Sequence, residues 1–221
     1  CPYHRHHHRA RNSPAGSDTT EYQVMMLAGP SGHIYSTRAR YGLSIPALDN
    51  NVAHNYLWEF FNAPSSGLTI EIQGIYPIPH TRHVRAPTTL ACQFDFFRTT
   101  AVSSGGSFGA FEASASTMTA NFFRYDTNDG SLSSHVSCKT EMTSITTGTR
   151  LWEWYSHYSN AGTLSGGAGG GSLLQSQNII PGGYSIEGKG FVIRTGTGLA
   201  CRMGPVASGG SHGWYLDFVA S

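Results

Sequence analysis

The sequence carries little charge. Lys, Arg, Asp and Glu make up 12% of its 221 residues, about half the share found in an ordinary soluble domain. Only Lys139 and Lys189 are lysines, and the net charge is +1. This balance gives no field that would attract nucleic acid or a membrane surface. A disordered chain would also be richer in charge and poorer in aromatic residues, which reach 12% here.

Long apolar segments and paired cysteines are missing as well. No apolar run approaches the roughly 18 residues needed to span a bilayer, so we expect no membrane partner. Cys1, Cys92, Cys138 and Cys201 lie far apart and form neither a C-x-x-C pair nor a zinc-type spacing. We expect free buried thiols. One or two disulfides remain the alternative, with a pairing that the sequence leaves open.

The usual signatures of catalysis are absent too. There is no G-x-S-x-G motif, and the glycine-rich residues 166–171 lack the lysine of a phosphate-binding loop. Asp126 and Asp129, followed by Gly130, predict a turn, because Asp and Asn bond their own backbone. A calcium loop is the alternative, since oxygen ligands suffice for this ion, but the D-x-D-x-D-G spacing is not present. We therefore expect no enzyme, no cofactor and no metal site.

Glycine and hydroxyl residues take the place of the missing charge. The chain holds 27 glycines and is rich in serine and threonine, a composition typical of a compact β protein with many turns. A soluble monomer normally keeps a charged surface. A charge-poor exterior suggests that much of it is buried in an assembly, although some secreted monomers share this composition.

Alternating polar and apolar residues predict an all-β fold. Leu68–Ile78 alternates most clearly, and Gly74 shifts its phase as a β-bulge would. Tyr56–Asn62 fits either a strand or one helical turn, and residues 41–55 fit a loop because of Pro46 and the turn residues after it. Further strand candidates are Leu90–Arg98, Asn121–Tyr125, Ser134–Thr140, Leu151–Tyr158, Phe191–Thr195, Leu199–Met203 and Trp214–Val219. Strands at about ten-residue spacing predict a sandwich or barrel.

Residues 1–20 read as an extended arm before a single β-sandwich domain of residues 21–221. Arg5, Arg9 and Arg11 are interleaved with four histidines at positions 4, 6, 7 and 8. We favour an arm that clasps a neighbouring subunit. Binding of nucleic-acid phosphates and chelation of a divalent metal by the histidines are the alternatives.

Two further segments are candidate contact surfaces. Arg82 and Arg85 lie in a proline-flanked stretch, which stiffens the chain and presents their side chains outward. A solvated loop is the simplest interpretation of this stretch, and a contact with acidic neighbours or phosphates at a subunit interface is the alternative. Trp152 and Trp154 share one face of a predicted strand, and alternation places Tyr155 on the other; Tyr158 completes this aromatic segment. Such rows are more often core or interface than sugar-binding platforms, which remain the alternative.

The C-terminal block reads NIIPGGYSIEGKGFVIRTGTGLACRMGPVASGGSHGWYLDFVA. Through Pro181-Gly182, Gly190–Arg194 and Leu216–Phe218 it resembles the closing segment of small phage and metagenomic virion structural proteins. The stretch NFFRYDTNDGSLSSHVSCKT resembles a "K-hydrophobic-D-x-x-D" connection between sheets in that group, and Leu68–Ile78 resembles its early strand. The similarity covers roughly residues 21–220 in pattern and order.

The resemblance implies a jelly-roll-like antiparallel β-sandwich on a virus particle. Its role would be that of a capsid decoration or cementing protein, or of a minor capsid protein. The partners would be copies of the same chain and a virion shell protein. A carbohydrate- or receptor-binding module on a fibre is one alternative, and a shell-forming capsid protein whose arm faces nucleic acid is another.

Overall fold

A computed structural model describes residues 27–28, 34–35, 38–49, 52–80, 90–113, 119–158, 178–181, 191–205 and 211–221. The chain divides into two units, residues 1–37 and 38–221. In the first unit, β1 (Leu27–Ala28) pairs antiparallel with β2 (Ile34–Tyr35). The arm and its predicted boundary at residue 21 lie outside the described residues and stay predictions.

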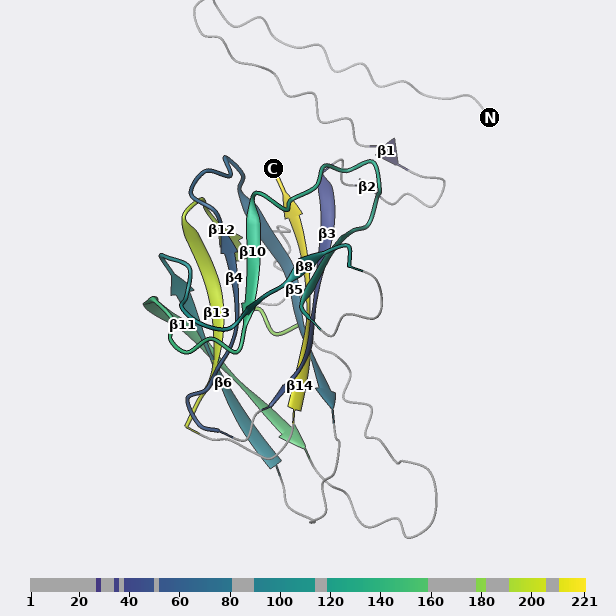
Figure 1. The fold of residues 1–221 in the computed structure, drawn as a ribbon. Helices are drawn as coiled ribbons and strands as arrows, with labels where there is room; N and C mark the ends of the chain where they lie inside the picture. The colour runs from purple at the N-terminus through teal and green to yellow at the C-terminus, as the bar shows by residue number, and fades with distance from the viewer. Residues whose placement is uncertain are drawn as a thin grey trace, which may run out of the picture. The chain divides into compact units, whose positions relative to one another are not determined.

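The second unit is a sandwich of two six-stranded sheets, which face each other in Figure 1. The β6 sheet consists, in order, of β11 (Thr147–Tyr158), β6 (Leu90–Thr99), β13 (Thr197–Met203), β4 (Tyr56–Asn62), β10 (Val136–Thr140) and β7 (Ser107–Phe108). The β14 sheet consists of β12 (Phe191–Ile193), β5 (Ile70–His80), β14 (Ser211–Ala220), β3 (Ala39–Asp49), β9 (Asn121–Arg124) and β8 (Ala110–Phe111). Within the described ranges all regular structure is strand, and no helix there is suited to cross a membrane.

Eight of these strands have the order of a jelly roll. In the β14 sheet they run β12-β5-β14-β3, and in the β6 sheet they run β11-β6-β13-β4. From β3 to β6, and again from β11 to β14, each strand lies in the opposite sheet to the one before it. Two interlocked Greek keys of this kind define the double-sheet jelly roll. The all-β, jelly-roll-like sandwich expected from the sequence is therefore confirmed.

An insertion between β6 and β11 widens both sheets. It contributes β9 and β8, which extend the β14 sheet beyond β3, and β10 and β7, which extend the β6 sheet beyond β4. β8 pairs parallel with β9, and the other pairings in the described sheets are antiparallel. The insertion therefore continues the sandwich at one edge.

The core follows the predicted alternation. On β5, Ile70, Ile72 and Ile75 are fully buried. The step from Ile72 to Ile75 spans three residues because the pairing with β14 shifts register beside Gly74, so the predicted bulge is confirmed. The extra residue keeps the isoleucines on the inner face on both sides of it.

Aromatic rings fill the space between the sheets. Trp214 of β14 packs edge-on against Trp58, Phe94 and Phe96 of the β6 sheet, with ring centroids 5.7, 5.0 and 6.0 Å apart. Such pairs contribute about 0.5–1.5 kcal/mol each beyond the area they bury. Because the interior is filled in this way, any partner or ligand would have to bind at the outer faces, edges or loops of the sandwich.

One prediction about secondary structure is wrong. Residues 41–55 do not form one loop, since β3 extends to Asp49 and places Tyr41, Leu43 and Ile45 in the core. Pro46 fits in β3 because the pairing with β14 shifts register beyond Ile45. At such an irregularity the backbone nitrogen of a strand residue does not have to donate a hydrogen bond to the neighbouring strand. Tyr56–Asn62 is a strand. Cys92, Cys138 and Cys201 are buried, and none of these three forms a disulfide with another of them.

Candidate interaction surfaces

An open groove lies on the outer face of the β14 sheet. The lining side chains of this hollow of about 340 Å³ come from β3, β5, β14 and the residue after β9. They are Arg40, Tyr76, Ile78, Tyr125, Tyr215 and Asp217, and we call this surface the tyrosine groove. Tyr125 and Ile78 are 50% and 41% exposed, so aromatic and aliphatic surface faces solvent here.

Two glycines shape the floor of this face. Asp217 is paired across the sheet with Gly42 on β3 and with Gly74 on β5. A Cβ on Gly42 would come within 2.3 Å of the Phe123 ring, and one on Gly74 within 2.4 Å of the Tyr76 ring. The missing side chains therefore let these two rings cover the backbone on either side of Asp217.

An ion pair anchors the centre of the groove. Arg40 donates from Nε to Asp217 Oδ1 at 2.9 Å and from Nη2 to Oδ2. The hydrogen bonds with this carboxylate raise the pKa of Arg40 further above its usual value. The guanidinium carbon also lies 5.0 Å from the centroid of the Tyr125 ring. A bidentate pair with a cation–π contact holds the guanidinium in one orientation.

The tyrosine hydroxyls connect the insertion to the sheet. Tyr125, directly after β9, shares a hydrogen bond between hydroxyls with Tyr215 of β14. Burial, and then this hydrogen bond, raise the pKa of Tyr215. The Tyr215 ring also packs against Tyr76 and Phe123, at centroid distances of 6.1 Å in both cases. The four rings thus form one continuous aromatic surface.

Arginines near the groove are paired with carboxylates. Arg38 Nη1 lies 2.7 Å from Glu71 Oε2, and Arg124 Nη2 lies 2.7 Å from Glu112 Oε2. Together with Arg40 and Asp217 these pairs cancel three positive charges. Asp129, whose Oδ2 accepts the Arg40 amide at 3.3 Å, adds a further negative charge, so this face has no surplus of positive charge.

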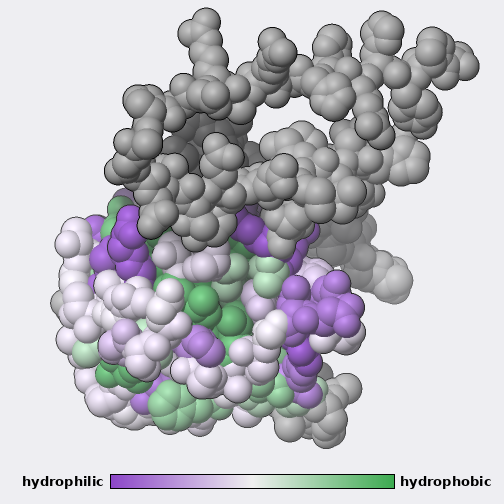
Figure 2. Space-filling view, turned by 90° about the horizontal axis from the view of Figure 1, so that it is seen from above, coloured by the Kyte–Doolittle hydropathy of each residue, from purple (hydrophilic) through white to green (hydrophobic). Residues whose placement is uncertain are grey.

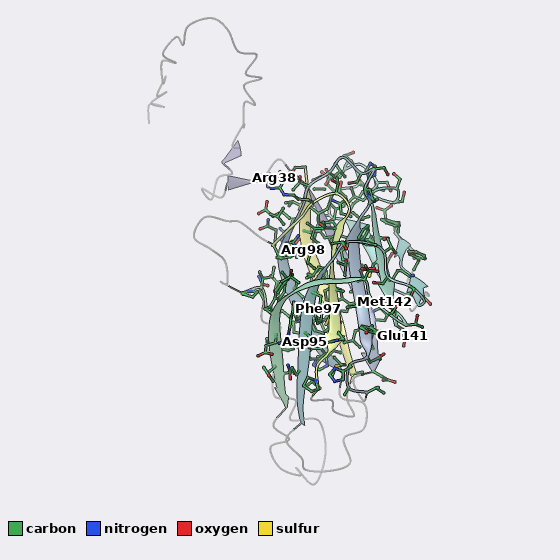
Figure 3. All side chains as sticks on the ribbon, turned by 90° about the vertical axis from the view of Figure 1, so that its left-hand side faces the viewer. Arg38, Asp95, Phe97, Arg98, Glu141 and Met142 are labelled. Carbon is green, nitrogen blue, oxygen red and sulfur yellow. The ribbon has the colours of Figure 1, made fainter. Side chains whose placement is uncertain are left out.

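A second cluster lies on the outer face of the β6 sheet, on the side of the molecule turned toward the viewer in Figure 3. Asp95 of β6 is almost fully buried and accepts hydrogen bonds from Arg150 Nη2 at 2.5 Å and from Arg202 Nη2 at 3.1 Å. Gln93 bridges Asp95 to Glu153, at 3.2 and 3.0 Å. These side chains come from β6, β11 and β13, so the cluster holds three neighbouring strands in register.

The insertion covers part of the same face. Phe97 of β6 and Met142, after β10, are labelled in Figure 3 and belong to one small apolar cluster with Ile145 and Ala200. Lys139 Nζ donates to the carbonyl oxygen of Ser103 at 2.7 Å. The Ser103 amide donates to Glu59 Oε2 at 2.8 Å. Buried polar contacts therefore fasten the insertion to the sheet.

The predicted tryptophans lie on the inner side of β11. The Trp152 ring stacks on Phe96 at 4.7 Å and the Trp154 ring on Phe94 at 5.6 Å. Tyr155 faces outward and is 42% exposed, as the alternation predicts. The structure therefore brings the two indoles together against the core and puts Tyr155 on the outer surface.

The remaining predicted contact residues stay untested. Arg5, Arg9, Arg11, Arg82 and Arg85 lie outside the described residues, and so does the side chain of Tyr158, whose backbone belongs to β11. The predicted turn at Asp126 is confirmed, because its carboxylate accepts the Asn128 amide at 2.9 Å. The structure gives no account of the basic segments.

The tyrosine groove was missed from the sequence, although one signal for it exists. In the predicted strand Trp214–Val219, alternation puts Tyr215 and Asp217 on the face opposite Trp214 and Leu216. An aspartate and a tyrosine on the outer face of a strand indicate a polar surface feature. Their partners on other strands become visible only when the pairing of β3 and β5 with β14 is known.

Comparisons with known proteins found no family model, no curated protein and no solved structure that matches this chain.

Proposed function

We propose that this chain is a virion structural protein that assembles by packing against copies of itself and a shell protein of the particle. The observation that carries the proposal is the order of the eight jelly-roll strands. Double-sheet jelly rolls of this order occur in viral capsid and lectin domains. The aromatic interior supports a structural role, since it leaves contacts between subunits to the outer surfaces. We propose no catalytic activity.

The exterior supports burial in an assembly. In the face shown in Figure 2, pale residues of intermediate hydropathy predominate, with separate hydrophilic and hydrophobic patches between them. Val52 between β3 and β4, and Val102 and Phe108 in the insertion, are 56%, 43% and 60% exposed. Aromatic residues are enriched in contacts between subunits, and Phe108, the most exposed of these three side chains, is suited to such a contact.

The arm and the 82–85 segment supply the proposed contacts outside the described residues. Arg5, Arg9 and Arg11 would clasp a neighbouring subunit. Arg82 and Arg85, in the connection between β5 and β6, would contact an acidic partner surface. A shell-forming protein whose arm binds the genome is the variant of this proposal that places nucleic acid inside the particle.

Electron microscopy and native mass measurement of the purified protein test the proposal. We expect large symmetric assemblies, and a stable monomer at all concentrations would overturn it. Deletion of residues 1–16 should weaken the assembly and leave the unfolding temperature of the sandwich unchanged. A full-length variant with Arg5, Arg9 and Arg11 replaced by Gln keeps the arm and removes its charge. It therefore shows whether assembly depends on the charge of the arm or on the presence of the segment. Particles that contain nucleic acid only when these arginines are present would identify the genome-facing arm.

A module that binds carbohydrate is a second candidate function. The tyrosine groove favours it, because an open hollow lined by tyrosines and a fixed ion pair suits a polar ligand with flat apolar faces. This candidate makes no use of the arm. A stable monomer that binds a glycan would favour it over the virion protein.

A further inference from the structure

The tyrosine groove has the size of a site for a small ligand. Its volume of about 340 Å³ lies at the lower end of the range of roughly 300–1,000 Å³ of ligand pockets. Its walls come from β3, β5, β14 and the residue after β9, so a regular sheet rather than a long loop positions the floor. Such a hollow accommodates one or two sugar rings.

The apolar part of the groove consists largely of ring surface. Tyr76 and Tyr215 lie 6.1 Å apart between centroids, and Tyr125 is half exposed beside them. The face of an aromatic ring is electron-rich and attracts weakly positive hydrogens. The axial C–H groups of a pyranose present hydrogens of this kind, so a sugar ring can pack on the faces of the tyrosine rings.

The polar part of the groove offers donors and acceptors at fixed positions. Arg40 uses Nε and Nη2 for Asp217, and its Nη1 has no partner among the described residues. The bond between the hydroxyls of Tyr125 and Tyr215 uses one of their two hydrogens, so the other remains to donate. A fixed guanidinium edge next to a hydroxyl pair matches neighbouring hydroxyl groups of a sugar, which both donate and accept.

The charges around the groove disfavour an acidic ligand. Arg38, Arg40 and Arg124 are each paired with a carboxylate. A nucleic-acid site needs surplus positive charge, because affinity for the backbone comes from neutralised phosphates. The absence of surplus positive charge does not weaken the binding of a neutral ligand that is rich in hydroxyl groups.

From the ring surfaces, the polar edge and the cancelled charge, we propose that the tyrosine groove is a binding site for a neutral glycan of one or two pyranose residues. The site lies on the outer face of the β14 sheet. The inference rests on the second candidate function, for which it names the ligand and the residues, and it is compatible with assembly through other surfaces. Tyr125 and Tyr215 stack on the ligand, and Arg40 and the hydroxyl pair orient it. Asp217 acts as a positioning residue by holding Arg40.

Saturation-transfer NMR with the full chain tests this proposal. The probes are the methyl glycosides of glucose, galactose, mannose and N-acetylglucosamine, with lactose and maltose as disaccharides. We expect transfer to at least one neutral sugar and a loss of affinity of at least tenfold in Tyr125→Ala. Tyr155→Ala is the matched control, an exposed tyrosine on the other sheet, and it should bind as the unchanged chain does. Unfolding temperatures verify that each variant is folded.

Four results would overturn the inference. The first is no saturation transfer to any of the neutral sugars, and the second is an equal loss of sugar affinity in Tyr125→Ala and Tyr155→Ala. The third is binding that is confined to sialyllactose or to a ten-nucleotide DNA. The fourth is an oligomer that dissociates in Tyr125→Ala when no sugar is bound. The third result would indicate an anion site and the fourth a contact between proteins. Assembly of the same variants is measured separately, so a failed sugar site and a failed assembly function are distinguished.

Discussion

Arg40 on β3 and Asp217 on β14 form a bidentate pair that lies diagonally across two neighbouring strands, since Arg40 is paired with Val219 and Asp217 with Gly42. The Asp217 side chain is 6% exposed and that of Arg40 is 55% exposed. One partner is therefore buried under the other. The pair links β3 to β14 in this register and also fixes the guanidinium of Arg40 in the tyrosine groove.

We predict that Arg40→Met lowers the free energy of unfolding by about 1–3 kcal/mol, because it leaves the buried Asp217 carboxylate without its charged donor. Arg38→Met is the control, because its carboxylate partner Glu71 is 15% exposed and therefore less buried than Asp217, and it should cost no more than about 1 kcal/mol. Urea unfolding at neutral pH measures both. Equal effects of the two substitutions would show that burial of Asp217 does not matter.

The glycines beneath the aromatic rings are expected to resist substitution. Gly42→Ala should destabilise the sandwich by about 1–3 kcal/mol, because the new methyl group meets the Phe123 ring and forces it off the sheet. Gly130→Ala has open space around its Cβ and should change stability by less than about 1 kcal/mol. Thermal unfolding compares the two, and a Gly42→Ala variant as stable as the unchanged chain would contradict the packing described.

The Asp95 cluster predicts unequal effects of its two carboxylates. Asp95→Ala should cost about 2–3 kcal/mol, since it leaves Arg150 and Arg202 without a buried partner. Because the Arg150 side chain is 46% exposed, solvent screens part of this loss. Glu153→Ala removes an exposed partner and should cost less than about 1 kcal/mol. Chemical denaturation measures the difference, which should shrink at high salt.

Trp152 and Tyr155 should behave differently although both were expected to be contact residues. Trp152→Ala removes a ring stacked on the core residue Phe96 and should destabilise the isolated sandwich by about 3 kcal/mol. Tyr155→Ala should change its stability by less than about 0.5 kcal/mol and affect only assembly. Unfolding curves and particle yields of both variants, measured in parallel, check this. A stable Trp152→Ala variant that fails to assemble would show that the indole is an interface residue.

Stability is expected to fall in alkaline solution. Burial raises the pKa of the Cys138 and Cys201 thiols above the usual value of 9.0. Above about pH 9 the unfolded chain releases these protons while the folded chain keeps them, so the unfolded state binds fewer protons and the free energy of unfolding falls with pH. The loss continues as the pH rises toward the folded-state pKa. Each thiol contributes a slope of up to about 1.4 kcal/mol per pH unit.

The Cys138→Ala variant isolates this effect. It should be less stable than the unchanged chain at neutral pH, because a buried side chain is lost, yet its stability should fall less steeply between about pH 9 and pH 10. Urea unfolding across this interval measures the slope. The same slope in both proteins would mean that the Cys138 thiol does not titrate on unfolding.

The pattern of single strands was predictable because it is local. Alternation over Leu68–Ile78 gave the inner face of β5 and its bulge at Gly74, and alternation over Leu151–Tyr158 separated Trp152 and Trp154 from Tyr155. Pro46 made residues 41–55 fit a loop, since proline normally ends a strand. It lies beside a shift in register with β14, a feature of a partner strand that is about 170 residues away in sequence.

The sequence by itself determined that this protein is all β, turn-rich and poor in charge, since composition and two-residue periodicity report which face of each strand is buried. Only the tertiary structure decided which strands lie side by side and hence what their outer faces hold. Arg40, Tyr76, Tyr125 and Asp217 are scattered along the chain, and each is unremarkable in its own segment. They meet because β14 pairs with both β3 and β5. Which strands pair over long distances in the sequence depends on how the whole core is buried, and this cannot be deduced from any single segment.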